Sequence, residues 1–288
     1  MAAESAVTTC FRHPQVESYV RCTRCDRHIC PSCMREAAVG HQCVECVKEG
    51  ARSVRQARTV FGAPVGTVPL VTYVLIGLNV VAYLVELARP EFEYRFAMLG
   101  ASPAGYVPEG VAHGEWYRLL TGAFLHMTPG EGTFGITHIL LNMVALWNVG
   151  RVVETQLGRI RYTALYLLSA LGGSVLELLL DPGSYSVGAS GAIFGLGAAY
   201  WVMGRRLGQD MRAVNRSMAG LLLWLVISAG LTSWQGHLGG LLAGGVVTLA
   251  FAYAPRDARR TVVQAGVCVA LTALLLVLAW LKATSLTG

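Results

Sequence analysis

Four polar residues in apolar segments are the ones whose types and spacing could do chemistry. The stretch SYSVGASGAIFGLGAAYW, residues 184–201, places Ser190 among small residues, and the segments THILLNMVALW and WQGHLGGLLAG contribute His138, Asn142 and His237. A buried serine ordinarily hydrogen-bonds to its own helix or lets a neighbouring helix come close; less often it is a nucleophile whose base comes from elsewhere. Three segments that each carry such a group favour the nucleophile.

The chemistry that these residue types support is acyl transfer. An imidazole within hydrogen-bond reach of a serine takes its proton and later returns it to the leaving amine, which makes Ser190 and His237 a candidate catalytic dyad. His138 and Asn142 are four residues apart, so they share a helix face and can donate to an oxyanion together with the Ser190 N–H.

Two other interpretations of this site are weaker. Glu177 and Asp181 end an apolar segment and are interpreted as interfacial residues, so no carboxylate is assigned to orient His237. The sequence GASGA lacks the second glycine of G-x-S-x-G, because Ala192 stands there, and no strand precedes it. The pattern therefore predicts a dyad and excludes a soluble serine hydrolase.

The elements that must position these residues are membrane helices. Of 288 residues, 54% are hydrophobic and 14% charged, and the mean hydropathy is +0.50, which is typical of a membrane protein. The first apolar window follows a long polar segment, so it is not a cleavable signal peptide. Seven windows predict spans, at about 68–88, 135–155, 160–180, 188–204, 217–233, 235–254 and 261–281.

Basic residues alternate between the connections of these spans. Most Lys and Arg residues precede span one or lie between spans two and three, after span four, and after span six; only Arg89, Arg95, Arg118 and Lys282 lie on the other side. The positive-inside rule then predicts a multi-pass protein of the cell membrane with a cytoplasmic N-terminus and an outer C-terminus. The net charge of +6 reflects this pattern, and we expect no nucleic-acid partner.

Spans two, four and six run in the same direction and carry their polar residues at their outer ends. Gly240 and Gly244 share a helix face with His237, and span four offers Gly191 and Gly195 in a GxxxG arrangement. Small residues on both helices predict a close approach that brings His237 to Ser190.

A cysteine-rich head precedes the spans. Seven of the eight cysteines, together with one histidine, form four pairs of identical spacing, while Cys268 alone is an apolar filler in the last span. The pairs are Cys10 with His13, Cys22 with Cys25, Cys30 with Cys33, and Cys43 with Cys46.

Four such pairs complete two tetrahedral zinc sites. Both ions would be structural, since no coordination position is left open, and none would serve catalysis. The alternative is a disulfide framework, which the expected cytosolic location disfavours. His28 and His41 belong to no pair and are interpreted as surface residues. A domain this small has too little hydrophobic core to fold without bound metal ions or disulfides.

The membrane portion resembles the rhomboid intramembrane serine proteases. The matching residues are G188-A189-S190-G191, H237-L238-G239-G240 with Gly244, H138-I139-L140-L141-N142, E115-W116-Y117-R118 followed by F124-L125-H126, and G150-R151-V152-V153-E154 with Gly158. The head resembles B-box and related cross-brace zinc fingers. That resemblance implies that the first and third pairs share one ion and the second and fourth the other.

The rhomboid resemblance implies a six-helix core with one added C-terminal helix, which cleaves transmembrane protein substrates near their outer ends by Ser190 and His237, with His138 and Asn142 at the oxyanion. Two positions depart from the family pattern. His126 is separated from His138 by the insertion MTPGEGTFGIT, and Phe194 stands where tyrosine is frequent.

The expected organisation is an all-α polytopic membrane protein behind a small zinc-stapled cytoplasmic domain. We expect the zinc-binding domain at 1–47, a basic juxtamembrane linker against the lipid bilayer at 48–67, the six-span core at 68–255 and the additional helix with a short tail at 256–288. The alternative function is a non-catalytic rhomboid-like scaffold whose zinc head recruits a cytosolic protein partner. A transporter is disfavoured, because the inner halves of the spans carry no line of polar residues.

Overall fold

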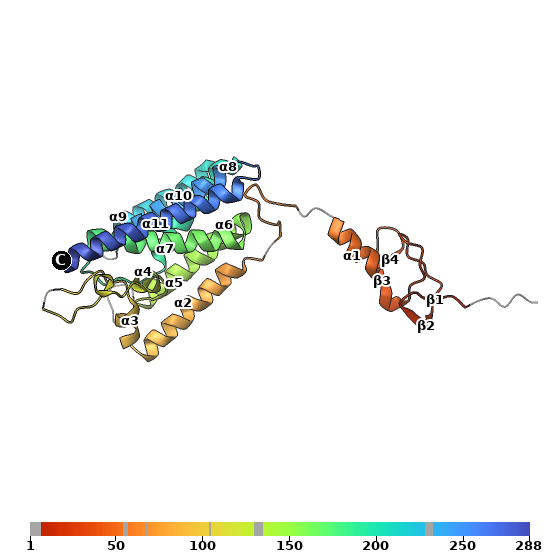
Figure 1. Ribbon diagram of the computed structural model, residues 1–288, viewed down its shortest axis with the longest axis horizontal. Coiled ribbons are helices and arrows are strands. Elements are labelled where there is room, and N and C mark those ends of the chain that lie inside the picture. Colours follow the sequence, from red (N-terminus) through yellow and green to blue (C-terminus); the bar gives the residue numbers. More distant parts are fainter. Residues whose placement is uncertain (1–6, 54–56, 67, 104, 130–134, 228–232) are drawn as a thin grey trace, which may run out of the picture. The chain divides into compact units, whose positions relative to one another are not determined.

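The computed structural model describes residues 7–53, 57–66, 68–103, 105–129, 135–227 and 233–288. The chain divides into two compact units, Met1–Ala57 and Arg58–Gly288 (Figure 1). The expected linker 48–67 is therefore divided between the units, with residues 48–53 ending a helix of the first. Residues 58–66 pack in the second unit, where Phe61 is fully buried in the core.

The first unit consists of two small hairpins and a helix. Strand β1 (Thr9–Cys10) pairs antiparallel with β2 (His13–Glu17), and β3 (Met34–Glu36) pairs antiparallel with β4 (His41–Cys43). The short helix η1 (Pro31–Cys33) precedes β3, and α1 (Val44–Ser53) follows β4. Apart from Ile29, the fully buried apolar residues described here are cysteines, so the unit has almost no conventional core.

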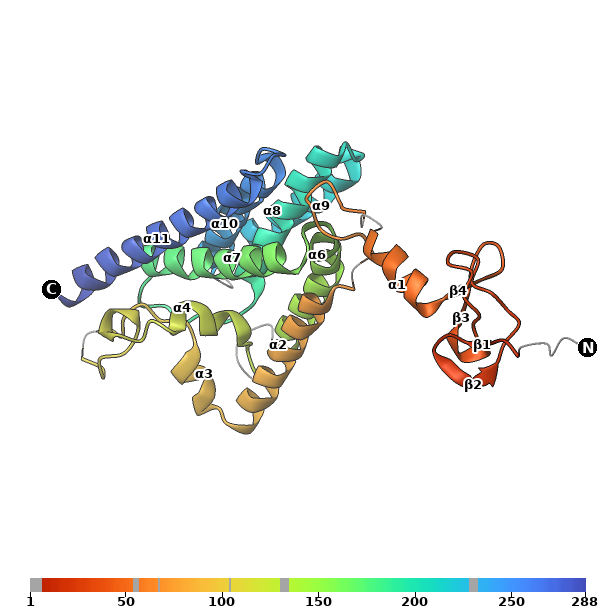
Figure 2. The same cartoon turned by 45° about the vertical axis from the view of Figure 1, so that its right-hand side comes forward.

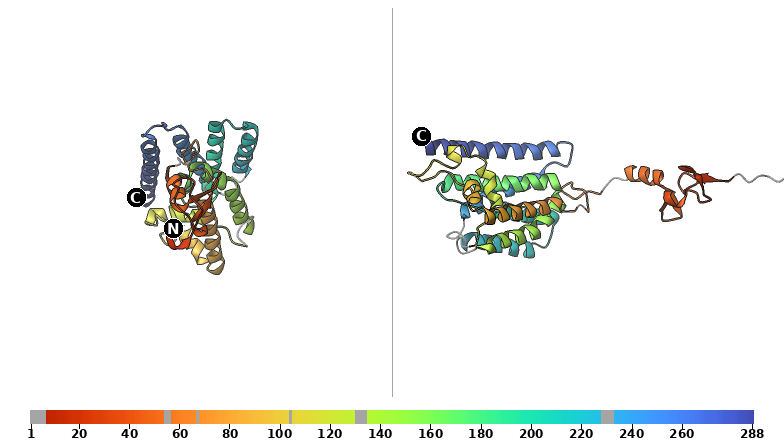
Figure 3. Two further views of the ribbon diagram at one scale, coloured as in Figure 1. Left: turned by 90° about the vertical axis from the view of Figure 1, so that its right-hand side faces the viewer. Right: turned by 90° about the horizontal axis from the view of Figure 1, so that it is seen from below.

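The second unit is helical. Its long elements are α2 (Leu70–Ala88), α5 (Ile136–Ala145) continued by η4 (Leu146–Gly150) and α6 (Arg151–Leu157), α7 (Arg159–Leu180), α8 (Ser190–Leu207), α9 (Met211–Ile227), α10 (Trp234–Tyr253) and α11 (Arg260–Thr287). Between α2 and α5 lie α3 (Glu91–Phe96), η2 (Val111–His113), α4 (Arg118–Thr121) and η3 (Gly122–Phe124). The long helices lie side by side in a bundle (Figure 3, right).

Each of the seven expected spans coincides with one of these helical segments. Five are long and apolar enough to cross a membrane: Leu70–Ala88, Ile136–Leu157, Arg159–Leu180, Trp234–Tyr253 and Arg260–Thr287. Helix α8 is less apolar because it contains several glycines and ends in two arginines, and the described part of α9 has 17 residues. Residues 228–232 of the expected fifth span lie outside the described residues.

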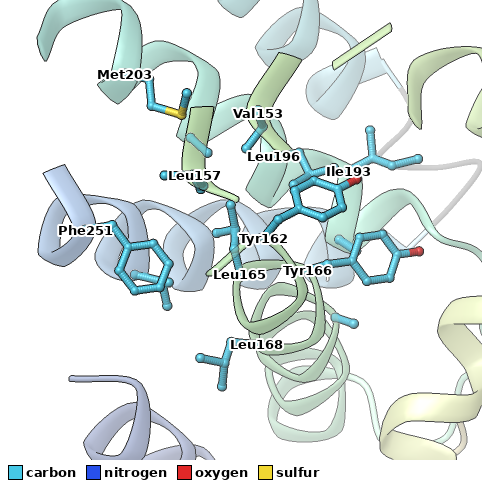
Figure 4. Close-up of a cluster of buried hydrophobic side chains, with 14 of the residues drawn as sticks. Val153, Leu157, Tyr162, Leu165, Tyr166, Leu168, Ile193, Leu196, Met203 and Phe251 are labelled. Carbon is cyan, nitrogen blue, oxygen red and sulfur yellow. The ribbon is translucent and has the colours of Figure 1, made fainter. Parts of the chain in front are cut away.

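Helix α7 occupies the centre of the bundle, and 67% of its apolar window is buried. It packs against α8, α10 and α11, which lies at the edge of the bundle (Figures 2 and 3). The core between α6, α7, α8 and α10 is shown in Figure 4 and includes Val153, Leu157, Tyr162, Leu165, Tyr166, Leu168, Ile193, Leu196, Met203 and Phe251. Large apolar side chains such as Val81 and Val277 remain exposed on α2 and α11, as expected of helices that face lipid.

Glycines bring α10 close to both of its neighbours. A Cβ on Gly240 would collide with the carbonyl oxygen of Gly191 on α8, and one on Gly244 would collide with the backbone of Gly195. On the other side of α10, a Cβ on Gly239 would collide with the carbonyl oxygen of Gly172 on α7. The small residues therefore fix α10 between α7 and α8 at backbone contact distance.

Candidate active site

The hydroxyl of Ser190 and the imidazole of His237 contact each other at one end of the bundle. Ser190 Oγ lies 2.8 Å from His237 Nε2, within hydrogen-bond distance. Ser190 is the first residue of α8, and His237 lies in the first turn of α10, whose N-terminus is capped by the Ser233 hydroxyl accepting from the Gly236 N–H at 3.1 Å. Both line a cavity of about 560 Å³.

The ring of Phe194 supports His237 from within α8. The two rings are stacked, with centroids 4.4 Å apart and planes 10° apart. His237 is 3% exposed, and its Nδ1 has no hydrogen-bond partner among the described residues. The side chain is therefore oriented by ring stacking and by Ser190, and no carboxylate within the described part of the chain bonds to it.

His138 lies across the cavity from this pair. Its Nδ1 accepts a hydrogen bond from the Met127 N–H at 3.3 Å, so a neutral His138 carries its proton on Nε2. Gly188 has a φ of 134°, and a Cβ there would lie 3.0 Å from His138 Nε2 and 3.5 Å from Ser190 Oγ. Glycine thus leaves open the space next to Ser190, and the Nε2–H of His138 lies beside it.

Asn142 is buried one turn further along α5. Its amide Nδ2 donates to the carbonyl oxygen of His138 at 2.9 Å. With His138, Ser190 and His237 it lines a second, more apolar cavity of about 300 Å³ beside Leu221 and Trp224 of α9. The four residues predicted from the sequence are therefore gathered around one site, and their catalytic roles remain predictions.

His126 is fully buried behind His138. Its ring Nε2 lies 2.9 Å from Asn79 Oδ1, and its backbone N–H donates to a carboxylate oxygen of Glu86 at 3.2 Å. The ring centroids of His126 and His138 are 5.2 Å apart, in an edge-on arrangement. Asn79 and Glu86 are both on α2 and have no exposed surface. Sequence reasoning missed both residues, although a buried amide and a carboxylate in an apolar span were a usable signal.

The interpretation of Glu177 as an interfacial residue is wrong, because the structure buries it. Its side chain is 3% exposed and lines the cavity that also contains Ser190 and His237. One of its carboxylate oxygens accepts from the Ser186 hydroxyl at 2.6 Å, and the other has no hydrogen-bond partner among the described residues. Asp181, in contrast, is exposed at the end of α7. The carboxylate holds the loop that enters α8 at Ser190.

The segment around Arg118 anchors the loop that covers this end of the bundle. Arg118 is 1% exposed, and its guanidinium donates to Tyr94 O at 2.7 Å, Ala97 O at 2.9 Å and Glu115 at 2.7 Å. Burial alone would raise the pKa of Glu115, but the hydrogen bonds from Gly110 N–H and Arg118 hold this pKa below its ordinary value. Glu115 is thus a carboxylate that neutralises a buried guanidinium.

The first unit contains two clusters of potential metal ligands. One comprises Cys10, His13, Cys30 and Cys33, and the other Cys22, Cys25, Cys43 and Cys46; in each, the ligand atoms lie within 4.8 Å of one another. None of the seven cysteines in these clusters forms a disulfide. The first pair therefore lies with the third and the second with the fourth, as in a cross-brace, while His28 and His41 belong to neither cluster.

The distances within each cluster fit a tetrahedral metal site. Two thiolates bound to zinc at 2.3 Å lie about 3.8 Å apart. Cys25 Sγ and Cys43 Sγ are 3.8 Å apart, and His13 Nδ1 lies 3.2 Å from Cys30 Sγ. The Cys43 N–H donates to Cys22 Sγ at 3.2 Å, a contact that stabilises a thiolate. These two clusters can each hold a metal ion.

Comparison with known proteins identifies the second unit. Residues 113–255 match the Rhomboid domain. The chain is 36% identical over 141 residues to Rhomboid protease GluP of Bacillus subtilis, which is 46% of this chain and 26% of that protein. It is 34% identical over 143 residues to the putative rhomboid protease YdcA of the same organism (47% of this chain, 67% of that protein). Against RHOMBOID-like protein 6, mitochondrial, of Arabidopsis thaliana, identity is 38% over 138 residues (45% of this chain, 42% of that protein).

The chain thus spans about a quarter of the length of GluP and two thirds of that of YdcA. The matched domain contains Ser190, His237, His138 and Asn142, and three of its helical segments, Ile136–Leu157, Arg159–Leu180 and Trp234–Tyr253, are long and apolar enough to cross a membrane. The chain belongs to the rhomboid family of polytopic membrane proteins.

Proposed function

We propose that this protein is an intramembrane serine endopeptidase that uses Ser190 and His237 as a catalytic dyad. The observation that carries the proposal is the 2.8 Å contact between Ser190 Oγ and His237 Nε2 in a cavity large enough to hold a strand of substrate. Its substrates are transmembrane proteins, and the scissile bond lies near the outer membrane face.

The reaction proceeds by acyl transfer. Ser190 Oγ attacks the scissile carbonyl carbon while His237 Nε2 accepts the hydroxyl proton, and the resulting imidazolium returns this proton to the leaving amine. Water then gives a proton to His237 and attacks the acyl carbon. When the bond from this carbon to Ser190 Oγ breaks, His237 returns the proton to Oγ, which releases the carboxylic acid product and restores the serine hydroxyl. Neutral His237 must carry its own proton on Nδ1, the nitrogen that has no partner among the described residues.

Three donors stabilise the oxyanion of the tetrahedral intermediate. They are the Ser190 N–H, the His138 Nε2–H and the Asn142 amide. The Met127 N–H supports this role, because it fixes the tautomer of His138 that donates toward Ser190. His138 is a donor here and does not compete with His237 for the serine proton.

The N-terminal unit is a zinc-binding domain with two structural ions. The supporting observation is the sulfur spacing and the set of three thiolates with one imidazole in one site and four thiolates in the other. Because protein atoms fill all positions, the ions would fold the domain without taking part in hydrolysis.

The basic residues of the sequence support an orientation with the N-terminus in the cytoplasm and the C-terminus outside. In this orientation the N-terminal ends of α8 and α10, and with them Ser190 and His237, lie toward the outer face. The dyad would then act on substrate spans from the outer side of the membrane.

The test is cleavage of a single-span model substrate by the reconstituted full-length protein. We expect wild-type protein to cleave and Ser190→Ala and His237→Ala to be inactive at an unchanged melting temperature, with Ser217→Ala as the active control on α9. An inactive wild-type protein with an intact fold, tested on several substrates, would point instead to a non-catalytic scaffold.

A further inference from the structure

Five arginines gather at the end of the bundle opposite Ser190. They come from five connections or helix ends: Arg58 from the segment before α2, Arg161 from the first turn of α7, Arg206 from the last turn of α8, Arg256 from the loop after α10 and Arg260 from the start of α11. The charges of Arg58 and Arg260 act on Arg161, and those of Arg206 and Arg256 act on Arg260. The cluster is therefore made by the tertiary fold rather than by one run of sequence.

Two of these guanidinium groups converge on one point. A Cβ added to Gly62 would lie 3.5 Å from Arg260 Nη1 and 3.7 Å from Arg161 Nη2. Both groups are held there by neutral partners: Arg161 Nε donates to Gln264 Oε1 at 2.8 Å, and Arg260 Nη2 donates to Val60 O at 2.9 Å. The fold thus fixes two like charges close together.

Within the described parts of the chain, no carboxylate neutralises this cluster. The ion pairs found there involve only Arg21, Arg24, Arg27 and Arg118. The nearby Asp257 uses its carboxylate to accept from the Arg259 N–H at 2.8 Å. The Nε of Arg260 is buried and has no acceptor among the described residues. Positioned guanidinium groups without acidic partners are the arrangement that binds an anion.

The position of the arginine cluster along the helices indicates which kind of anion it binds. The candidate spans Arg159–Leu180 and Arg260–Thr287 both begin at this end, so the arginines lie where the apolar part of each helix starts. In a bilayer this level is occupied by lipid phosphate groups, and basic pockets between helices bind acidic headgroups. We propose that Arg161 and Arg260, with Arg58, Arg206 and Arg256 around them, bind the phosphate group of an anionic phospholipid.

The experiment uses the full-length protein in a neutral detergent, with its unfolding temperature followed during titration with phosphatidylglycerol. Phosphatidylcholine and inorganic phosphate at matched ionic strength are the comparison ligands. Each arginine that faces the bound phosphate contributes about 1 kcal/mol, so Arg256→Gln should raise the phosphatidylglycerol midpoint about fivefold. The double variant Arg161→Gln with Arg260→Gln should raise it roughly 30-fold.

Arg159→Gln is the matched control, because Arg159 has the same charge, lies on the same helix turn as Arg161 and is exposed. Its midpoint should equal that of the wild-type protein. Arg256 is also exposed, so Arg256→Gln keeps the test valid if the double variant does not fold. Equal phosphatidylglycerol midpoints in all variants would overturn the site. Equal protection by inorganic phosphate would overturn the lipid assignment and favour a soluble phosphate.

Discussion

The backbones of Gly191 and Gly240 touch, and this contact sets the position of the proposed catalytic pair. A Cβ on Gly240 has no room beside the Gly191 carbonyl oxygen, and a glycine at each place lets α10 approach α8 until His237 reaches Ser190.

Gly240→Ala should therefore separate α8 from α10. We expect a loss of stability of about 3 kcal/mol from overpacking and loss of substrate cleavage, because the contact between Ser190 and His237 lengthens. Gly245→Ala is the control, since a Cβ there meets only Ala198 at 3.9 Å. Thermal unfolding and cleavage of the model substrate measure the two effects. Equal behaviour of the two variants would contradict the role of the close approach.

Phe194→Ala should slow cleavage by about fivefold, because the lost ring stacking is worth roughly 1 kcal/mol and the freed imidazole leaves the orientation that faces Ser190. Phe194→Tyr keeps the stacked ring and should retain the wild-type rate. The measurement is kcat for the model substrate in reconstituted membranes. An alanine variant with full kcat would show that the ring only fills space.

Glu177→Leu should lower kcat about tenfold, because it removes the acceptor of the buried Ser186 hydroxyl, a loss of roughly 1 to 3 kcal/mol, and loosens the loop before Ser190. Glu177→Gln retains an acceptor oxygen and should lose less. The exposed Asp181→Asn is the control and should behave as wild-type protein. If Asp181→Asn and Glu177→Leu give the same kcat, the carboxylate of Glu177 does not position the loop before Ser190.

The zinc-binding proposal predicts two zinc ions per chain, measured by elemental analysis of the purified full-length protein. Cys30→Ser should reduce the content to about one ion, because each cluster needs its four ligands, while His41→Ala should keep two. Chelation should unfold the N-terminal unit without abolishing cleavage by the membrane unit. Full zinc content in Cys30→Ser would contradict the four-ligand assignment.

The orientation predicts that the loop between α7 and α8 is reached from outside the cell. Gly183 is exposed and a Cβ there meets no other atom within 4 Å, so Gly183→Cys should fold and react with a membrane-impermeant maleimide added to intact cells. Ala258→Cys, in the exposed loop between α10 and α11, should react only after the cells are opened. Reaction of Gly183→Cys only in opened cells would reverse the topology.

Much of the site could be read from the sequence, because an isolated serine, two histidines and an asparagine are conspicuous in apolar helices. The residues that were missed or misplaced have weaker local signals. Glu177 stands near a helix end, where a carboxylate is ordinarily solvated, but the 182–186 segment and the start of α10 pack against it. Asn79 and Glu86 lie far from His126 in sequence, and their contact depends on how α2 packs.

The sequence by itself determined the helical membrane class, the positions of the apolar spans and the four ligand pairs of the head, because these depend on hydropathy, charge and local spacing. The tertiary structure decided which groups meet. It brings together Ser190 and His237, which are 47 positions apart in the sequence, and it turns the Nε2 of His138 toward the open space at Gly188. It also gathers five arginines from separate segments. Such contacts are long-range and follow from backbone approach and side-chain packing, which no local pattern specifies.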